Sequence, residues 1–139
     1  MCKPLLLILP LLALASCSTT HMPKLPKPPE YKVLATQHGM ASWYSVKTNR
    51  GTKTASGRRL HDNGRTAAHK YWPLGSKVRV TCLFNGESRI LTITDRGPYV
   101  KGRVIDVTIG AAKRMGFYSR GITKVKIELL ERGKWQYQH

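Results

Sequence analysis

The stretch KVRVTCLFNGESRILTIT, residues 77–94, decides the fold class of this 139-residue chain. Two runs rich in β-branched residues, 77–83 and 88–94, stand on either side of the pair Asn85-Gly86. Such runs, with partial alternation of apolar and polar residues, are typical of strands. Asn-Gly between them favours a type I′ turn, in which both central residues have a positive φ. The sequence therefore predicts a β-hairpin.

The segments that follow the hairpin extend the β pattern. Residues 103–107 (RVIDV) and 122–129 (ITKVKIEL) have the composition of strands. Between them, Thr108 is a suitable N-cap for a short helix over residues 109–115, which is expected to stop at Gly116. Short strands around a single small helix, without internal repeats, indicate a mainly β protein with a small closed barrel.

Composition and charge restrict the kind of partner. Hydrophobic residues make up 41% of the chain, close to the average of globular proteins, so one folded domain is expected. Against 24 Lys and Arg there are 7 Asp and Glu, a formal net charge of +17. This excess predicts an anionic partner or surface. No recognisable nucleic-acid motif accompanies the charge, and the export signal described next argues against nucleic acid as that partner.

The amino-terminal segment indicates export. After one lysine, an apolar run over residues 5–15 has the length of a signal-peptide core and is too short to span a bilayer. It ends in LASC, residues 14–17, which resembles the bacterial lipobox. Residues 1–16 are therefore expected to be a cleaved signal peptide, and Cys17 the lipid-attachment site that anchors the chain to a membrane. An ordinary secretory signal with an incidental cysteine is the alternative.

Residues 17–37 are predicted to be a tether. They contain four prolines and several lysines, a composition that favours extended polyproline II and buries little apolar area. Ser18 stands where inner-membrane lipoproteins carry a retaining Asp, so the outer membrane, facing the periplasm, is expected rather than the cell membrane. The folded domain is expected over residues 38–131, followed by a tail, 132–139.

Several short motifs occur together in this domain. They are GMASWY (39–44), TASG (54–57), TAAH (66–69), PLGSKVRVT (73–81), DRGP (95–98) and GRVIDV (102–107). In this order and spacing they resemble the rare lipoprotein A family, and the resemblance covers residues 38 to about 131. It implies a six-stranded double-psi β-barrel with one or two short helices, a fold also found in expansins.

The resemblance also implies an activity, endolytic lytic cleavage of peptidoglycan. The bond cut lies between MurNAc and GlcNAc in glycan strands stripped of stem peptides, and the products have 1,6-anhydro-MurNAc ends. Membrane attachment and division-site partners at the septal ring accompany this activity in the family. Because the C6 hydroxyl of the sugar itself attacks C1, no second carboxylate needs to activate water, and one acid is sufficient. No cofactor is expected.

Asp95 is the predicted catalytic acid. It follows a predicted strand and precedes the turn over residues 96–98, so spacing alone favours a turn-forming Asp, and the resemblance shifts the interpretation to catalysis. His69 matches a family residue implicated in activity and is expected to hydrogen-bond the acid or a sugar hydroxyl. No second metal ligand stands at a suitable spacing from it, so no metal is expected. Asp106, inside a strand, is interpreted as a buried, hydrogen-bonded structural acid.

The predicted substrate-binding residues are aromatic or polar. Trp43, Tyr44 and Tyr99 offer flat faces on which pyranose rings stack, although core packing is an equal alternative for Trp43. Ser56, in a shared motif, is placed in the same set. Arg96 is expected either to hold lactyl or acetamido oxygens or to pair with a nearby acid.

One position departs from the family pattern. Where the family has a Glu directly after residues 55–57, this chain has Arg58, and the usual acid three positions later is His61, with Asp62 beside it as a substitute. A guanidinium near Asp95 would stabilise the ionised carboxyl and lower its pKa. Arg58 thus favours a non-catalytic, expansin-like glycan-binding module, whereas the intact acid and histidine favour the enzyme. We expect the enzyme, because a single acid is chemically sufficient.

Overall fold

The structure is a computed structural model that describes residues 4, 10–13, 15–16 and 26–135. Cys17, most of the predicted signal peptide and part of the predicted tether lie outside the described residues. The elements are β1 (Ala35–Tyr44), β2 (Thr66–Ala68), β3 (Lys77–Cys82), β4 (Ser88–Asp95), β5 (Arg103–Thr108), α1 (Ile109–Arg114) and β6 (Ile122–Glu131). Within the described part of the chain, no helix combines the length and apolar character that a membrane crossing requires.

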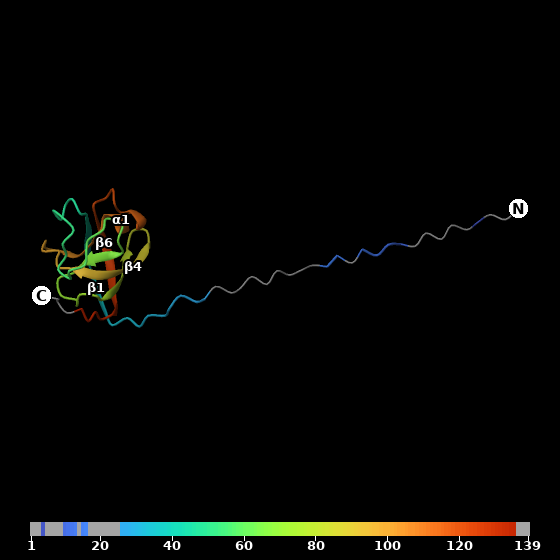
Figure 1. Cartoon of the computed structure of the whole chain (residues 1–139), viewed down its shortest axis with the longest axis horizontal. Helices are drawn as coiled ribbons and strands as arrows, with labels where there is room; N and C mark the ends of the chain where they lie inside the picture. Colours follow the sequence, from blue (N-terminus) through green and yellow to red (C-terminus); the bar gives the residue numbers. More distant parts are fainter. Residues whose placement is uncertain (1–3, 5–9, 14, 17–25, 136–139) are drawn as a thin grey trace.

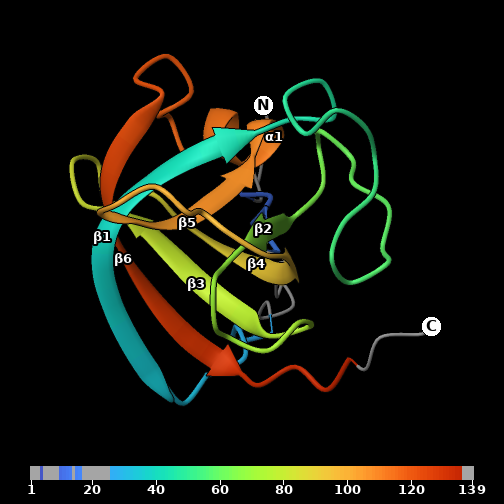
Figure 2. The same cartoon turned by 90° about the vertical axis from the view of Figure 1, so that its left-hand side faces the viewer.

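The six strands close into a barrel in the order β1-β5-β2-β4-β3-β6 (Figure 1). The pairs β1–β5 and β2–β4 are parallel, and the other pairs are antiparallel. Figure 2 shows the strands curving around a shared interior, with α1 beside one end. The prediction of a mainly β, six-stranded barrel with a short helix is therefore confirmed.

The core lies inside this barrel because the inward positions of each strand are apolar. In β3, Val78, Val80 and Cys82 are fully buried and alternate with partly exposed residues. β6 buries alternate residues in the same way, among them Val125 and Ile127. This period of two is the pattern from which the strands were predicted.

The hairpin between β3 and β4 is confirmed, but its predicted type I′ turn is wrong. Of Asn85 and Gly86, only Gly86 has a positive φ, 72°. The loop contains four residues, 83–86, closed by Cys82 N–H donating to Glu87 O at 2.9 Å and Gly86 N–H donating to Cys82 O at 2.9 Å. The side chain of Asn85 accepts from Glu87 N–H and donates to a carbonyl at the end of α1, so a long-range contact selects the longer loop.

Both ends of the predicted helix are close to those observed. Thr108 is the N-cap of α1, and its hydroxyl accepts from Ala111 N–H at 3.3 Å and donates to Gly64 O at 2.6 Å. The chain leaves the helix at Met115, directly before Gly116. Thr108 thereby joins the helix to the loop between β1 and β2.

The start of the folded domain differs from the prediction. β1 begins at Ala35, inside the segment predicted to be a tether, and Leu34 N–H donates to Leu129 O at 2.8 Å. Pairing with β6 extends the strand beyond the point at which the proline-rich composition ends. Residues 26–34 contain no helix or strand and leave the barrel as an extended chain (Figure 1).

Candidate functional site

Asp95 is the last residue of β4, as the sequence predicts, and lies at the centre of the candidate site. Its Oδ1 accepts hydrogen bonds from the N–H groups of Ala55 at 3.0 Å and Arg96 at 2.9 Å. Ala55 belongs to the loop between β1 and β2, so this loop is fixed on the carboxylate. The bond from Arg96 is the local contact of a turn-forming Asp. Neither bond uses Oδ2, and the residue is partly exposed, so this oxygen is available to a ligand.

A second carboxyl lies across β2 from Asp95. Ala68 is the register partner of Asp95 in β4 and of Asp106 in β5. The pairing of β2 with β4 shifts register between Ala67 and Ala68, and Asp95 and Asp106 lie on the strands on either side of Ala68. Two strand spacings separate their Cα atoms by about 10 Å. Sequence reasoning missed this pair, because the register of three strands cannot be read from any one of them.

Asp106 is hydrogen-bonded, as predicted, but through only one of its two carboxylate oxygens. Its Oδ2 accepts from Arg103 Nη2 at 2.8 Å, while its Oδ1 is buried without a hydrogen-bond partner in the described residues. Burial raises the pKa of Asp106, and the hydrogen bond and charge of Arg103 oppose that rise. The protonated form is therefore favoured relative to an ordinary aspartate.

Tyr44, the last residue of β1, completes the cluster. Its hydroxyl is buried and, like Thr94 Oγ1, has no hydrogen-bond partner in the described part of the chain. Burial raises the pKa of Tyr44, the charges of Asp95 and Asp106 raise it further, and the nearby hydroxyl of Thr94 opposes the rise. The phenol thus lies near both acids and stays protonated. Buried polar atoms without partners are rare in folded proteins, so their concentration around two carboxyls marks a functional site.

His69 is beside this cluster but does not bond to the acid through its side chain. Its Nδ1 accepts from the N–H groups of Tyr71 and Trp72, each at 3.0 Å, and its Nε2 lies 3.0 Å from Gln37 Oε1. The acceptor role of Nδ1 makes Nε2–H the donor in a neutral ring. Burial, together with the nearby charge of Arg96, lowers the pKa of His69 to about 4. The expected hydrogen bond from its ring to Asp95 is absent from these contacts, which occupy both nitrogens.

The side chain of Arg96 bonds to backbone carbonyl groups rather than to an acid. Its Nη1 donates to His69 O at 3.1 Å and to Trp72 O at 2.8 Å. These bonds differ from the expected pair with a nearby acid, whereas the other expectation, a contact with substrate, stays a prediction. Arg96 instead ties the segment after β2 to the turn that follows Asp95.

The fold and this carboxyl cluster can be compared with known proteins. A family model described as "Lytic transglycolase" matches residues 36–127. The chain belongs to this family. The barrel is accordingly a double-psi β-barrel, and the resemblance to the rare lipoprotein A family is confirmed by the relatives described next.

Three relatives in the lytic transglycolase family are similar to this chain over 93 to 100 residues. The endolytic peptidoglycan transglycosylase RlpA of Rickettsia felis is 50% identical over 68% of this chain and 42% of its own length. The protein of the same name from Pseudomonas aeruginosa is 46% identical over 72% of this chain and 29% of its own. A probable endolytic peptidoglycan transglycosylase RlpA from Synechocystis is 44% identical over 67% and 29%. The chain thus spans less than half of each relative's length.

Solved structures share the fold at low sequence identity. Streptomyces papain inhibitor has a TM-score of 0.58 and 16% identity, over 73% of this chain and all of that one. An expansin of Clavibacter michiganensis has a TM-score of 0.54 and 16% identity, over 72% of this chain and 52% of the expansin. A variant of that expansin was solved in complex with cellohexaose.

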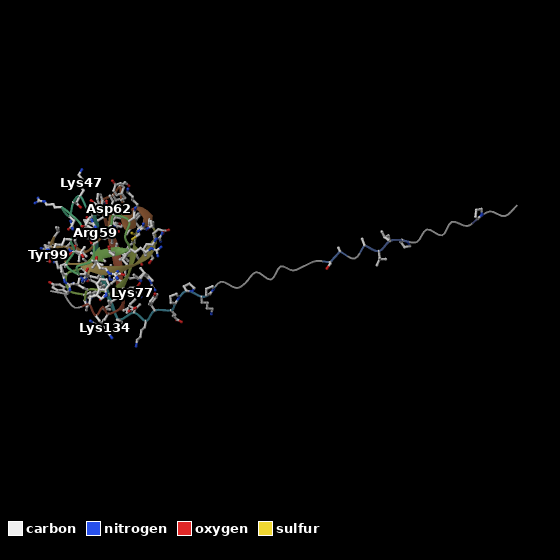
Figure 3. The ribbon with its side chains drawn as sticks, in the orientation of Figure 1. Lys47, Arg59, Asp62, Lys77, Tyr99 and Lys134 are labelled. Atoms are coloured by element: carbon white, nitrogen blue, oxygen red, sulfur yellow. The ribbon has the colours of Figure 1, made fainter. Side chains whose placement is uncertain are left out.

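The aromatic residues expected to bind sugar divide into two groups. Trp43 packs against the core, its Nε1 donates to Tyr118 O at 3.1 Å, and its ring lies 5.0 Å from that of Tyr118. The packing alternative therefore describes Trp43 better than stacking on sugar. Tyr44 is in the carboxyl cluster. Tyr99, which is 78% exposed, lies on the left-hand side of the domain in Figure 3, as does Arg59 of the loop that contacts Asp95.

The loop with the departure from the family pattern is fastened to β4. Ser56 N–H donates to Thr94 O at 2.9 Å, next to the Ala55 bond to Asp95. The Ser56 hydroxyl lies 3.0 Å from Thr54 Oγ1 and accepts from Arg58 N–H at 3.2 Å. Its oxygen therefore supports the loop internally, whereas the sequence placed it among the substrate-binding groups.

Arg58 does not form an ion pair with Asp95 within 4.0 Å; its guanidinium carbon lies 4.4 Å from the ring centroid of Trp135. The expected direct stabilisation of the ionised acid by this arginine is therefore not found. Asp62, the suggested substitute acid, accepts from Val46 N–H at 2.6 Å and shapes the loop instead. No sequence signal pointed to Trp135, which lies in the predicted tail.

Proposed function

We propose that this chain is a lytic transglycosylase that cleaves the MurNAc–GlcNAc bond of peptidoglycan glycan strands and leaves 1,6-anhydro-MurNAc ends. The observation that carries the proposal is the cluster at one end of β2, where Asp95 and Asp106 flank Ala68 beside the hydroxyl of Tyr44. Membership of the lytic transglycolase family and the printed names of the relatives support the same activity.

Asp95 is the group that touches the glycan in this proposal. Its carboxylic acid donates a proton to the glycosidic oxygen as the bond from that oxygen to C1 breaks. The C6 hydroxyl of the same MurNAc attacks C1 and returns its proton to the Asp95 carboxylate. The proton is thereby restored, and no water is consumed. The two N–H groups on Oδ1 hold the carboxyl in one orientation through both transfers.

Asp106, on the strand beyond Ala68, and Tyr44, whose pKa is raised by the charge of Asp95, form the surroundings of the catalytic acid. Burial raises the pKa values of both groups, so each ionises less readily than an exposed aspartate or tyrosine. His69 is a positioning residue: its neutral ring and the Arg96 bonds fix the segment after β2 against Asp95. The expansin in complex with cellohexaose supports a glycan as the ligand of this fold.

The test is a digest of glycan strands freed of stem peptides. Residues 26–139 include every strand and the buried core, so this soluble chain is expected to fold without the signal segment. We expect 1,6-anhydro ends by mass spectrometry, and a loss of at least about 100-fold in Asp95→Asn. In this variant the amide oxygen still accepts from Ala55 N–H, so the fold is retained. Equal yield from Asp95→Asn would disprove the assigned role.

A second function, binding of glycan without cleavage, is favoured by Arg58, which replaces the Glu of the family pattern. This alternative predicts retention of the soluble chain on glycan strands with no anhydro product. Product from Arg58→Glu alone would identify a lapsed enzyme. Product from the unmodified chain excludes the binding-only function.

The proposal extends to the location of the protein. The lipobox-like pattern supports a lipid anchor on Cys17 in the outer membrane, facing the periplasm, with septal-ring proteins at the division site as partners. Metabolic labelling with an alkyne fatty acid is expected to mark the full chain and not Cys17→Ser. Label that persists in Cys17→Ser would show that acylation occurs elsewhere.

A further inference from the structure

We propose that Arg58, held over Trp135, is a recognition site for a carboxylate on the glycan, next to the catalytic Asp95. This inference rests on the proposed function and specifies which chemical group of the substrate the site selects. It is carried by the way the Arg58 side chain is held, by its place beside the acid and by the charge of its loop.

Trp135 lies between two partners. Gly75 (φ 87°) is beneath one face of the indole, since a Cβ on Gly75 would meet three ring atoms at 2.8 to 2.9 Å. The guanidinium carbon of Arg58 lies over the ring, 4.4 Å from its centroid. Only glycine leaves room for the ring at this position. The stack therefore holds the Arg58 side chain in one place and reduces the entropy that would be lost on ligand binding.

The segment that carries Trp135 is itself fixed to the barrel. Gly133 N–H donates to the hydroxyl of buried Ser76 at 2.9 Å, and Trp135 N–H donates to Leu74 O at 3.4 Å. A side chain at Gly133 would collide with the backbone of the turn at Leu74. This part of the predicted tail is therefore an ordered wall of the site.

Both halves of the stack rest on the residues that lead to Asp95. Gly75 N–H donates to Ile93 O at 2.7 Å, and the loop of Arg58 is joined to β4 through Ser56 N–H, which donates to Thr94 O at 2.9 Å. Arg58 follows Ala55, the direct donor to Asp95, by three positions, and three residues span at most about 11 Å. The guanidinium is thus carried on the loop whose backbone is hydrogen-bonded to the acid and to the residue before it.

The charge of the surrounding segment favours an anion. Residues 45–72 contain seven Lys and Arg and a single acid, Asp62. One carboxylate oxygen of Asp62, Oδ1, accepts a hydrogen bond from Val46 N–H at 2.6 Å. The side chain of Arg58 is exposed and has no ion-pair partner among the described residues. A guanidinium that stacks on an aromatic ring still presents its N–H edge, which matches a carboxylate in bidentate geometry.

Peptidoglycan offers this carboxylate in two ways. A MurNAc without a stem peptide has a free lactyl carboxylate close to the glycosidic bond, and an attached peptide converts that group into an amide while adding carboxylates further away. The lactyl group is the carboxylate that the sugar itself carries, and the loop of Arg58 is bonded to Asp95, so the lactyl group is the assigned ligand. The site would then distinguish stripped glycan from glycan that still bears peptides.

Binding of three strand preparations to residues 26–139 tests the inference. The strands are free of peptide, free of peptide with lactyl carboxyls converted to methylamides, or still peptide-bearing. The Asp95→Asn variant keeps the strands intact during the measurement. We expect tightest binding to the free lactyl strands, and about tenfold weaker binding to the methylamides.

Five substitutions on this background, one of them a control, sharpen the test. Arg58→Gln should lose the preference for the free carboxylate, about tenfold, and Arg58→Lys should keep only part of it. Trp135→Ala should weaken the preference, whereas Trp135→Phe, which keeps a ring, should largely restore it. Arg59→Gln removes the adjacent exposed cation, seen in Figure 3, and is the matched control with little change expected.

The outcomes separate this inference from the proposed function. Equal affinity for free and methylamidated strands overturns the inference. An equal loss of affinity for both strands in Arg58→Gln overturns it as well. Tighter binding to peptide-bearing strands assigns the recognised carboxylate to the peptide and overturns the lactyl assignment. Anhydro product without carboxylate preference leaves only the proposed function standing. Carboxylate preference without anhydro product from the unmodified chain leaves only the inference. Absence of binding to every strand rejects both.

Discussion

In the wall formed by β3 and β6 the charged groups are paired, whereas at the site end, formed by β2, β4, β5 and the last residue of β1, several buried polar groups have no partner in the described residues. On the wall, the carboxylate of Glu128 lies 3.4 Å from both Arg79 and Lys126, and Lys77 pairs with Glu131 at 3.2 Å. These charges alternate with fully buried apolar residues facing the core. Each of these wall carboxylates has a cation within 4.0 Å.

The site end leaves polar atoms without partners. Asp106 Oδ1 and the hydroxyls of Tyr44 and Thr94 are buried and unsatisfied in the described residues, and Asp95 is held by backbone donors alone. Unsatisfied buried groups destabilise a fold by about 1–3 kcal/mol each. The comparison indicates that the wall stabilises the barrel, whereas the site end keeps polar groups that lower stability and are available for binding and catalysis. Four predictions test this division.

The largest effect is expected for the wall. Ile127, in β6, is fully buried, so Ile127→Ala leaves a cavity and should reduce the free energy of unfolding by about 2–5 kcal/mol. The yield of anhydro product per folded molecule should not change. Urea unfolding measures the first quantity, with Ile122→Ala, at an exposed position, as the control. A large loss of activity in a sample that is still folded would contradict the division.

His69 should make stability depend on pH. Its pKa is lowered from 6.5 to about 4, so between these two pH values the unfolded state binds a proton that the folded state does not bind. The stability is present above pH 6.5 and is lost as pH falls towards 4, by about 3 kcal/mol in total. His69→Asn, whose oxygen replaces Nδ1 as acceptor, should flatten this dependence in urea titrations at several pH values. His61→Asn is the exposed control, and an equal flattening there would refute the assignment.

A smaller effect, on activity, is expected between the two carboxyls. Ala68→Val adds two methyl groups where Asp95 and Asp106 flank a single one. We expect about a tenfold loss of anhydro product, with an overpacking cost of about 1–3 kcal/mol. Ala67→Val, on the inward face, is the comparison variant and should cost stability without a specific loss of activity. Full activity in Ala68→Val would place the glycan elsewhere.

The smallest effects should come from the ion pairs of the wall. Glu128 is 12% exposed and serves two cations, so Glu128→Gln should cost about 1 kcal/mol. Glu131 is 58% exposed in its pair with Lys77, and Glu131→Gln should cost less than about 0.5 kcal/mol. Urea midpoints at low and high salt measure both. The same cost for both variants would show that burial does not matter on this wall.

Local patterns predicted much of the fold. The β-branched runs located β3 and β4, and the capping hydroxyl of Thr108 located α1, because these signals act between neighbours in the chain. The turn type was wrong because Asn85 bonds to a carbonyl 30 positions away. The domain boundary was too late because β1 is extended by pairing with β6.

The site was predicted less completely than the fold. Asp95 could be chosen from its place at a strand end. The placement of Asp95 and Asp106 on either side of Ala68 depends on the register of three strands, which no single motif encodes. The stack of Arg58 on Trp135 joins positions far apart in the chain, and neither has a local signal for it.

The pairing of β1 with β6, which closes the barrel, determines when the barrel can fold relative to its synthesis. β1 pairs with β6, so the first strand has no partner on that side until the last strand has been synthesised. Contacts between distant parts of a chain form slowly, and here they cannot form at all on a ribosome-bound fragment that lacks β6. A nascent chain that lacks β6 therefore cannot close the barrel, and closure becomes a step that follows synthesis of the last strand.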